Sequence, residues 1–320
     1  MSLSKLGLDW ETLPGEMKME VVKWLDYESR CRLERTSIGN YQIIKAVPIR
    51  ISQMHVKTGS KSTGTGILCE IKPYISERVP SAQVLETFQS LFEHKASQID
   101  ELQLGSNSQG DTRYGSEFYH DLCEEMGRRH LIRIRKLEWN CTVHMGGVLV
   151  NVLECLDPNT LKTLHCTETL KSEPMRKLMA TKQWKSLEEV EIGSTSFPMH
   201  IEQFWHFKNF RIVIPRLTEV DAWRLIKHRR SLPLSAHSFF YVGTHKPFED
   251  TTKILEQFDV KPKNEPVLNT NRENVHTQRF RLAHRDDLVL IVEIKASSIE
   301  GYALFKEHIS DYQHPFINLD

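Results

Sequence analysis

Hydrophobic positions along the chain recur in one spacing, apolar-x-x-apolar-x-apolar. The first copy is Ile51-x-x-Met54-x-Val56, directly after a predominantly helical pattern. The alternation at the end of each copy is typical of a short strand with one buried face. The spacing therefore predicts six such strands, whose central apolar residues are Met54, Leu102, Leu137, Leu164, Val190 and Phe210.

Apolar residues at helical spacing fill several intervals between these strands. They group as Phe118, Leu122 and Met126, as Val148, Val152, Leu153 and Leu156, and as Met175, Leu178 and Met179. The gaps between strand centres are 48, 35, 27, 26 and 20 residues, and the later gaps are close to the ~20–29 residues of a leucine-rich repeat. The alternation predicts an α/β fold with an irregular, leucine-rich-repeat-like curved sheet and outer helices. The alternative is chance recurrence of a common spacing.

Residues 10–47 predict three short helices before the first strand. Pro14 suits a first helical turn, whereas Asp26 and Asn40 suit the starts of the second and third helices. Helices of this size bury little surface, and Trp10 and Leu13 are expected, with Pro14, to lie outside their shared apolar face. Apolar residues left over from so small a unit indicate a partner that covers them. The residues that form the expected apolar faces are Met17, Val21, Trp24, Leu25, Leu33, Ile43, Ile44 and Val47.

The same segment resembles an F-box. The resemblance is carried by the order Leu13-Pro14-x-Glu16, Val21-Val22, Leu25-Asp26, Arg30, Leu33 and Ser37, and the string LDYESRCRLERTS is similar to the F-boxes of large nematode families. It implies docking on a Skp-type adaptor protein, which connects the chain to a cullin scaffold in an SCF-type ubiquitin ligase. The adaptor-binding residues that it implies are Trp10, Leu13, Pro14, Met17, Val21, Val22, Leu25 and Leu33.

One position departs from the F-box pattern. Gly15 stands where an acidic residue that favours a helix is commoner, and glycine weakens a helix by up to ~1 kcal/mol. The alternative to an F-box is an ordinary N-terminal helical cap that packs on the rest of the chain.

A second resemblance covers roughly residues 82–310. It is to the FTH domain (F-box two homology) and implies a substrate-recruiting module. The segments that carry it are 204–210, 217–221, the helix end at 229–230, and 280–282 with the string LVLIVEIKAS. The organisation expected from the two resemblances is an F-box at 8–50, connecting strands with a Gly/Ser-rich turn at 51–81, and an FTH-like domain at 82–310.

A row of polar residues is a candidate substrate surface. On each predicted strand, the residue between the buried positions points away from the helices. We expect this row to contact an unknown protein substrate, although a merely solvated sheet face is the alternative. The row consists of Gln103, Glu138, His165, Glu191 and Arg211.

The C-terminal part predicts a cap for the sheet. Strands are expected at 275–282 and 288–294, joined by a turn at 283–287. A helix is expected at about 298–308, with Ile299, Leu304 and Phe305 apolar. Because terminal repeats need an atypical cap, these elements are expected to close the sheet.

Composition and charge narrow the classes of function. Lys plus Arg and Asp plus Glu are both 42, and a net charge of zero argues against nucleic-acid binding. The sequence holds neither an apolar run of the ~20 residues that span a membrane nor an evident secretory signal. The six cysteines form no C-x-x-C pair, so free buried thiols are expected. These features favour a cytoplasmic or nuclear protein.

The sequence does not carry a recognisable catalytic or metal motif. The glycine-rich segment 59–66 lacks the lysine of a phosphate-binding loop and is expected to be a turn. The fifteen histidines form no helical metal-binding pair, and none of the cysteines has a local signature for a nucleophile. The basic run 227–230 is expected to end a helix, where cations suit the helix dipole. We therefore expect no catalytic residue, cofactor or metal, and a non-catalytic ligase subunit; a protein-interaction scaffold outside ubiquitin ligation is the alternative.

Overall fold

The computed structural model describes residues 10–61, 64–72, 75–79, 81–106, 112–127, 131–141, 145–258, 276–311 and 317–318. Contacts divide the chain into two compact units. The first unit is Met1–Lys162 with Thr181–Ser186, and the second is Thr163–Ala180 with Leu187–Asp320. Both combine helices and strands, so the predicted α/β class is confirmed. Within the described ranges, every helix is too short or too polar to cross a membrane.

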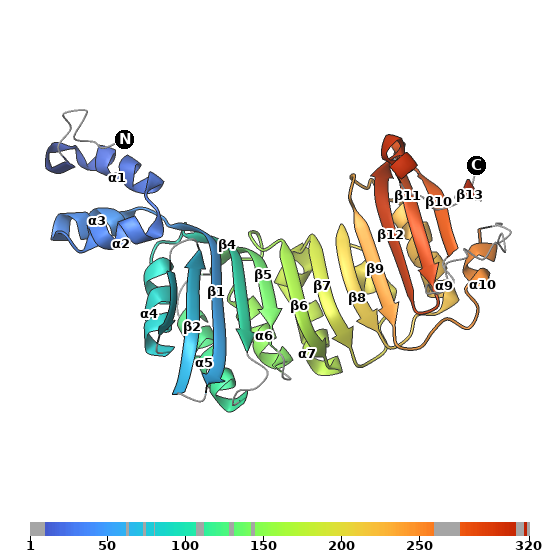
Figure 1. The fold of residues 1–320 in the computed structure, drawn as a ribbon, viewed down its shortest axis with the longest axis horizontal. Helices are drawn as coiled ribbons and strands as arrows, with labels where there is room; N and C mark the ends of the chain where they lie inside the picture. The colour runs from blue at the N-terminus through green and yellow to red at the C-terminus, as the bar shows by residue number, and fades with distance from the viewer. Residues whose placement is uncertain are drawn as a thin grey trace. The chain divides into compact units, whose positions relative to one another are not determined.

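The first unit begins with helices and continues with five strands (Figure 1). Its N-terminal elements are η2 (Trp10–Thr12), α1 (Gly15–Trp24), α2 (Tyr27–Glu34) and α3 (Ile38–Ala46). Its strands are β1 (Arg50–Lys61), β2 (Gly64–Lys72), β3 (Ile75–Val79), β4 (Gln98–Ser106) and β5 (Arg133–Asn140). Its other helices are α4 (Ser81–Leu91), α5 (Thr112–Gly127), α6 (Gly146–Glu154) and α8 (Lys182–Ser186).

The strands of the first unit follow the order β5-β4-β1-β2-β3. The β1, β4 and β5 strands are parallel, and the central apolar residues predicted from the repeat pair directly, Met54 with Leu102 and Leu102 with Leu137. The β2 and β3 strands add antiparallel neighbours. The prediction of a turn over 59–66 is wrong for most of that segment, because residues 59–61 belong to β1 and residues 64–66 belong to β2. Lys61 pairs with Gly64, and residues 62–63 lie outside the described ranges.

The second unit contains four parallel strands and four antiparallel or terminal ones. Its strands are β6 (Thr163–Leu170), β7 (Glu189–Thr195), β8 (Asn209–Ile214), β9 (Phe239–Thr244), β10 (His276–Leu282), β11 (Arg285–Lys295), β12 (Ser298–Phe305) and β13 (Ile317–Asn318). Their order is β6-β7-β8-β9-β12-β11-β10-β13. The helices are α7 (Ser172–Ala180), η3 (Ile201–Phe204), α9 (Glu219–Ser231), α10 (Thr252–Glu256) and η4 (Lys306–Asp311).

The predicted repeat is also in register in the second unit. Leu164 pairs with Val190, and Val190 pairs with Phe210. The row continues to Phe240 of β9, a fourth parallel strand that the repeat spacing does not predict. Figure 1 shows α9 behind the strands of this unit, and the apolar residues of the row are buried.

The prediction of a helix at about 298–308 is wrong. Residues 298–305 form β12, which pairs with β11 on one side and β9 on the other, and only 306–311 are helical. Gly301 explains the choice, because a Cβ there would lie 2.3 Å from the Phe240 ring. Glycine thus leaves room for the Phe240 ring beside β12, and pairing on both edges outweighs the weak helical spacing.

The core of each unit is made of apolar residues from strands and helices. In the first unit, Tyr119 packs against Trp139 with ring centroids 5.3 Å apart, and its hydroxyl donates to the Gly105 carbonyl at 2.6 Å. In the second unit the core is aromatic, and its fully buried rings are Phe204, Phe207, Phe210, Phe240 and Phe280. These packed layers give each unit a rigid base for the residues on its open strand face.

All six cysteines are free thiols, but the expectation that they are buried holds only in part. Three are buried, Cys69, Cys141 and Cys166, and three are half-buried, Cys31, Cys123 and Cys155. The sequence pattern could not separate the two groups because burial of a thiol depends on the packing of distant elements.

Candidate functional site

The three-helix region, residues 10–47, is built from capped short helices. Asp26 begins α2 as predicted, since its Oδ1 accepts a hydrogen bond from the Ser29 N–H at 2.7 Å. The expectation that Asn40 begins the third helix is wrong. Ser37 caps α3 by accepting from the Asn40 N–H at 3.1 Å. These caps set the residues at which α2 and α3 begin, and the starting residue determines which side chains face inward.

A small core and one buried arginine hold the three helices together. Val22, Ile44 and Val47 are buried, and the side chains packed against them are those of Trp10, Met19, Leu25, Leu33 and Ile43. The Arg30 guanidinium is also buried, donating to the Leu25 carbonyl at 3.1 Å and the Pro48 carbonyl at 3.0 Å. Burial lowers the pKa of Arg30, while carbonyls at the ends of α1 and α3 satisfy its donors.

The same helices leave large apolar side chains in solvent. The exposed fractions are 88% for Trp24 and 79% for Ile38, and Met17 and Tyr41 are about half exposed. Met17 and Trp24 are seven residues apart on α1, which places them on one side of the helix. Within the described ranges, the other exposed large apolar residues are Leu131 and Val220. Apolar exposure is therefore concentrated on the three-helix region.

The predicted adaptor-binding residues lie at different depths. Pro14 and Met17 are exposed, Leu13 and Val21 are half-buried, Trp10, Leu25 and Leu33 pack against the core, and Val22 is fully buried. The expectation that Trp10 lies outside the helical packing is wrong, because its Nε1 donates to Asn40 Oδ1 at 2.9 Å and its ring contacts the core. Val22 therefore belongs to the core beneath the predicted adaptor-binding residues, and a partner cannot contact it.

Sequence reasoning missed two residues of this surface. Ile38 and Tyr41 are three residues apart on α3, and both are exposed. The available signal was Ser37, because a helix that it caps places Ile38 in the first turn, ahead of the inward positions. Trp24 was assigned to an apolar face in the sequence, and the structure shows that this face is open to solvent.

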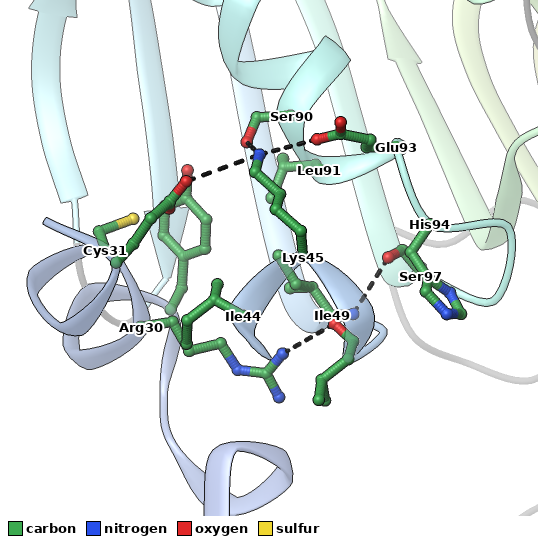
Figure 2. A pocket seen from close by; sticks show the side chains of 13 residues that line it. Arg30, Cys31, Ile44, Lys45, Ile49, Ser90, Leu91, Glu93, His94 and Ser97 are labelled. Carbon is green, nitrogen blue, oxygen red and sulfur yellow. Dashed lines mark hydrogen bonds and ion pairs between the residues drawn. The ribbon is translucent and has the colours of Figure 1, made fainter. Parts of the chain in front are cut away.

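A polar junction connects the three-helix region to α4 and the turn that follows it (Figure 2). The Lys45 ammonium lies 2.9 Å from Ser90 Oγ, 2.8 Å from Glu93 Oε2 and 3.7 Å from Glu34 Oε1. Burial by itself lowers the pKa of Lys45, but the hydrogen bond to Glu93 and the charge of Glu34 raise it overall. Lys45 therefore stays charged and links α3 to α4 and the turn after it through an ion pair and a hydrogen bond.

Backbone bonds reinforce the junction. The Ile49 N–H donates to Ser97 Oγ at 3.0 Å, and the Gln98 N–H donates to the Ile49 carbonyl at 2.8 Å. The space enclosed between these elements is about 20 Å³, which is room for about one water molecule. The junction is thus a packed contact between elements, not a site for a small-molecule ligand, and no residue of α1 lines it.

The predicted substrate row falls in both units. In the first unit, Gln103 and Glu138 are neighbours in register on β4 and β5. Lys136 makes an ion pair with Glu138 at 2.5 Å, and Gln53 Nε2 donates to Glu101 Oε1 at 2.8 Å. These half-buried groups form a mixed-charge surface, with each charge close to an opposite charge.

In the second unit, His165, Glu191 and Arg211 are neighbours in register. Arg211 lies 3.8 Å from Glu191, and its guanidinium stacks 4.7 Å from the centre of the Tyr241 ring. Tyr241 was not predicted because the repeat pattern did not reach β9. Its ring adds an apolar surface to the polar row, which favours contact with a protein chain.

The row continues onto β12, where the sequence had predicted a helix. Glu300 pairs in register with Tyr241, and it accepts a hydrogen bond from the Tyr302 hydroxyl at 2.8 Å. Burial alone would raise the pKa of Glu300, but hydrogen bonds from Lys295 and Tyr302 lower it overall. Burial and the hydrogen bond to Glu300 raise the pKa of Tyr302. The residues therefore form a polar network between neighbouring strands.

Two further predictions concern chemistry. In the described part of the chain, no three His, Cys, Asp or Glu side chains lie together in a way that could hold a metal ion. The basic run 227–230 ends α9, as predicted. Arg229 is fully buried and donates to the carbonyls of Phe207 at 2.9 Å and Lys208 at 2.6 Å. It therefore supports the fold and is not available to a ligand.

Comparison with known proteins identifies one part of the chain. Residues 121–261 match the family model described as the FTH domain. The match begins within α5 and ends shortly after α10, so it takes in β5 to β9 and is narrower than the resemblance over 82–310. No curated protein matches the chain. The FTH resemblance is thereby supported for residues 121–261.

Proposed function

We propose, from the FTH match at residues 121–261, that the chain is the substrate-recognition subunit of an SCF-type cullin ubiquitin ligase. The three-helix region acts as an F-box and docks on a Skp-type adaptor, and the strand-rich part binds a target protein. The chain itself does not perform ubiquitin transfer. It holds target lysines close to the charged ubiquitin carrier, which raises their effective concentration. It works in the cytosol, the nucleus or both.

The observation that carries the proposal is the exposure of Trp24 and Ile38. Both belong to helices that also contribute Val22 and Ile44 to a buried core, so the exposure is not a sign of unfolded helices. An aromatic side chain of this size buries ~150–250 Å² when covered. At ~25 cal/mol per Å², covering Trp24 alone contributes at most about 4–6 kcal/mol to association.

The junction supports the same proposal. Lys45 and the Ile49–Ser97 bond tie α3 to the first unit, while α1 leaves Met17 and Trp24 open. The alternative in which the helices are an ordinary cap requires their apolar surface to be covered by the rest of the chain. The 88% exposure of Trp24 favours a partner protein instead.

The polar row is proposed to bind the target protein. His165, Glu191 and Arg211 present charges of both signs beside the Tyr241 ring. Such a surface suits a protein partner with complementary charges and gives specificity more than affinity. Alanine at Glu138, His165 and Glu191 together is expected to abolish target capture while adaptor binding persists, and unchanged capture would reject this part of the proposal.

The docking step is tested with the purified full-length chain and a Skp-type adaptor. Trp24→Ala combined with Ile38→Ala is expected to weaken adaptor binding at least ~100-fold, because two apolar contacts of more than 1.4 kcal/mol each are lost. The matched control is Val220→Ala, which removes an exposed apolar side chain from α9 and leaves the affinity unchanged. Calorimetry measures both.

Two results would contradict the proposal. Native affinity in the double variant would show that α1 and α3 do not contact the adaptor. Failure of the unchanged chain to bind any Skp-type adaptor would favour a protein-interaction scaffold outside ubiquitin ligation.

A further inference from the structure

Helices α5 and α6 pack together and bring two cysteines close to each other. Cys123 lies on α5, and Cys155 is the C-terminal capping residue of α6. The two side chains line the same depression. Cys155 Sγ also lies 3.6 Å from the Cys123 carbonyl oxygen and 3.3 Å from the Asn151 carbonyl oxygen. The pair is 32 residues apart in sequence, and its contact depends on the packing of the two helices.

The thiol pair opens onto a hollow. Cys123 and Cys155 both line a depression of about 340 Å³, together with His120, Glu124 and Glu154. Both cysteines are half-buried, whereas Cys69, Cys141 and Cys166 are buried. The remaining half-buried thiol, Cys31, lines the cavity of about 20 Å³ at the junction. Among the six cysteines, Cys123 and Cys155 thus combine closeness to a second cysteine with access for a small molecule.

We propose that Cys123 and Cys155 form an oxidisable dithiol site that closes into a disulfide when a small neutral hydroperoxide enters the hollow. The charges around the hollow select this class of oxidant. Glu124 and Glu154 place carboxylates beside the thiols, and His120 lies 3.6 Å from Glu124. Carboxylates at this position repel anionic oxidants such as glutathione disulfide, whereas hydrogen peroxide carries no charge.

The reaction proceeds in two balanced steps. In the first, one thiol loses its proton and its sulfur attacks a peroxide oxygen; the O–O bond breaks, and the departing hydroxide takes up a proton to give water and a sulfenic acid. In the second, the other sulfur attacks the sulfenic sulfur, the S–S bond forms and the S–O bond breaks to release a second water. Two thiols thereby lose two electrons and two protons, and one peroxide becomes two waters.

The opposite pKa shifts of the two neighbouring thiols support an order of attack. The hydrogen bond from Cys123 lowers the pKa of Cys155, and the same bond together with burial raises the pKa of Cys123. Cys155 is thus the sulfur that attacks first, and Cys123 completes the disulfide. The C-terminal end of α6 and the neighbouring carboxylates oppose a thiolate, so the site reacts more slowly than a catalytic peroxidase cysteine.

The consequence is a covalent tie between α5 and α6. Both cysteines lie in the segment that matches the FTH domain, and Cys123 lies near its start. A cross-link across 32 residues restricts the unfolded chain and raises the melting temperature of the oxidised form. The inference does not depend on the proposed role in ubiquitin ligation.

Peptide mapping of the full-length chain tests the site. The reduced protein is treated with hydrogen peroxide, denatured with N-ethylmaleimide to block free thiols, digested without reductant and analysed by mass spectrometry. The expected result is the loss of two of the six free thiols and recovery of one linked pair, Cys123 with Cys155, which dithiothreitol separates. Cys31→Ser is the matched control and retains the link.

A trapping variant tests the order of the two steps. In Cys123→Ser the second step cannot occur, so Cys155 is expected to retain sulfenic acid that dimedone labels. The mapping of the unchanged chain stands whether or not this variant folds. A map in which Cys123 and Cys155 remain unlinked, or in which links form among all cysteines equally, would overturn the proposal.

Discussion

The three-helix region and the second unit differ in how completely they bury their large apolar side chains. The second unit buries five phenylalanines completely, and Val220 is its exposed large apolar residue among those described. The three-helix region buries Val22, Ile44 and Val47, yet it exposes Trp24 and Ile38. Because a smaller core gains less from apolar burial, this exposure is the feature on which the proposed docking of a partner rests.

Each region nevertheless uses a buried arginine in the same way. Arg30 donates to carbonyls at the ends of α1 and α3, and Arg229 donates to the carbonyls of Phe207 and Lys208. Burial lowers the pKa of Arg229 to about 10, so it remains charged at neutral pH. In both regions a buried arginine donates to backbone carbonyls, so the coverage of apolar side chains is what distinguishes the two regions.

The largest expected effect is at Arg229. Arg229→Met removes the donors for buried carbonyls and is expected to lower the free energy of unfolding by about 3–5 kcal/mol. Urea denaturation measures the loss. Arg224→Ala is the control on the exposed side of α9 and should change stability by less than about 0.5 kcal/mol. A loss below about 1 kcal/mol at Arg229 would show that the carbonyls find other donors.

Two isoleucines on α3 test the comparison within one helix. Ile44 is 3% exposed and Ile38 is 79% exposed. Ile44→Ala is expected to destabilise the three-helix region by about 2–4 kcal/mol through lost packing. Ile38→Ala should be within about 0.5 kcal/mol of neutral, since alanine favours a helix. Hydrogen exchange in residues 15–46 measures the local stability of both variants. An equal loss of stability in the two variants would contradict the assignment of buried and exposed faces.

The junction is expected to have a smaller effect. Lys45→Met removes the ion pair with Glu93 and the hydrogen bond with Ser90, which costs about 1 kcal/mol for a partly exposed pair. Proteolysis between α3 and β1, at residues 47–49, should then become several-fold faster. Lys23→Met, which breaks the exposed pair with Glu20 on α1, is the control. Equal cleavage rates of both variants would show that the contacts of Lys45 do not stabilise the connection between α3 and β1.

The smallest expected effect is a pH dependence in the second unit. Although burial by itself raises the pKa of Glu219, backbone N–H groups, including those of Asp250 and Glu249, lower it overall. The unfolded chain therefore binds this proton more readily, so the stabilisation is present above the unfolded pKa of about 4.5 and is lost as the pH falls through the folded pKa.

Glu219→Gln should accordingly reduce the difference in unfolding free energy between pH 6 and pH 3 by about 0.5 kcal/mol, a value set low for a partly exposed group. Glu256→Gln at an exposed position of α10 is the control. Denaturation at the two pH values measures the difference. An unchanged loss of unfolding free energy between pH 6 and pH 3 in Glu219→Gln would show that ionised Glu219 does not stabilise the fold.

The sequence predicted the parallel strands well because their pattern reflects burial on one face. Met54, Leu102 and Leu137 are aligned in the structure as the repeat requires. It failed at β12, where Gly301 and pairing with two neighbouring strands decide the conformation. Apolar spacing reports local periodicity, and it does not report which strands a segment meets on folding.

The candidate surface on the three helices was less predictable. The spacing of Met17 and Trp24 predicted a shared face, but it could not show that the face is open. Trp10 was misplaced because its hydrogen bond to Asn40 connects residues 30 positions apart. The Ser37 cap, visible in the sequence, would have placed Ile38 correctly. Whether the polar row binds a target remains a prediction.

Hydrogen exchange of the full-length chain with and without a Skp-type adaptor tests the central claim most directly. We expect the adaptor to slow exchange in α1 and α3, around Trp24 and Ile38, and to leave exchange in β6 to β9 unchanged. Protection confined to the strands, or no protection anywhere at saturating adaptor, would contradict it.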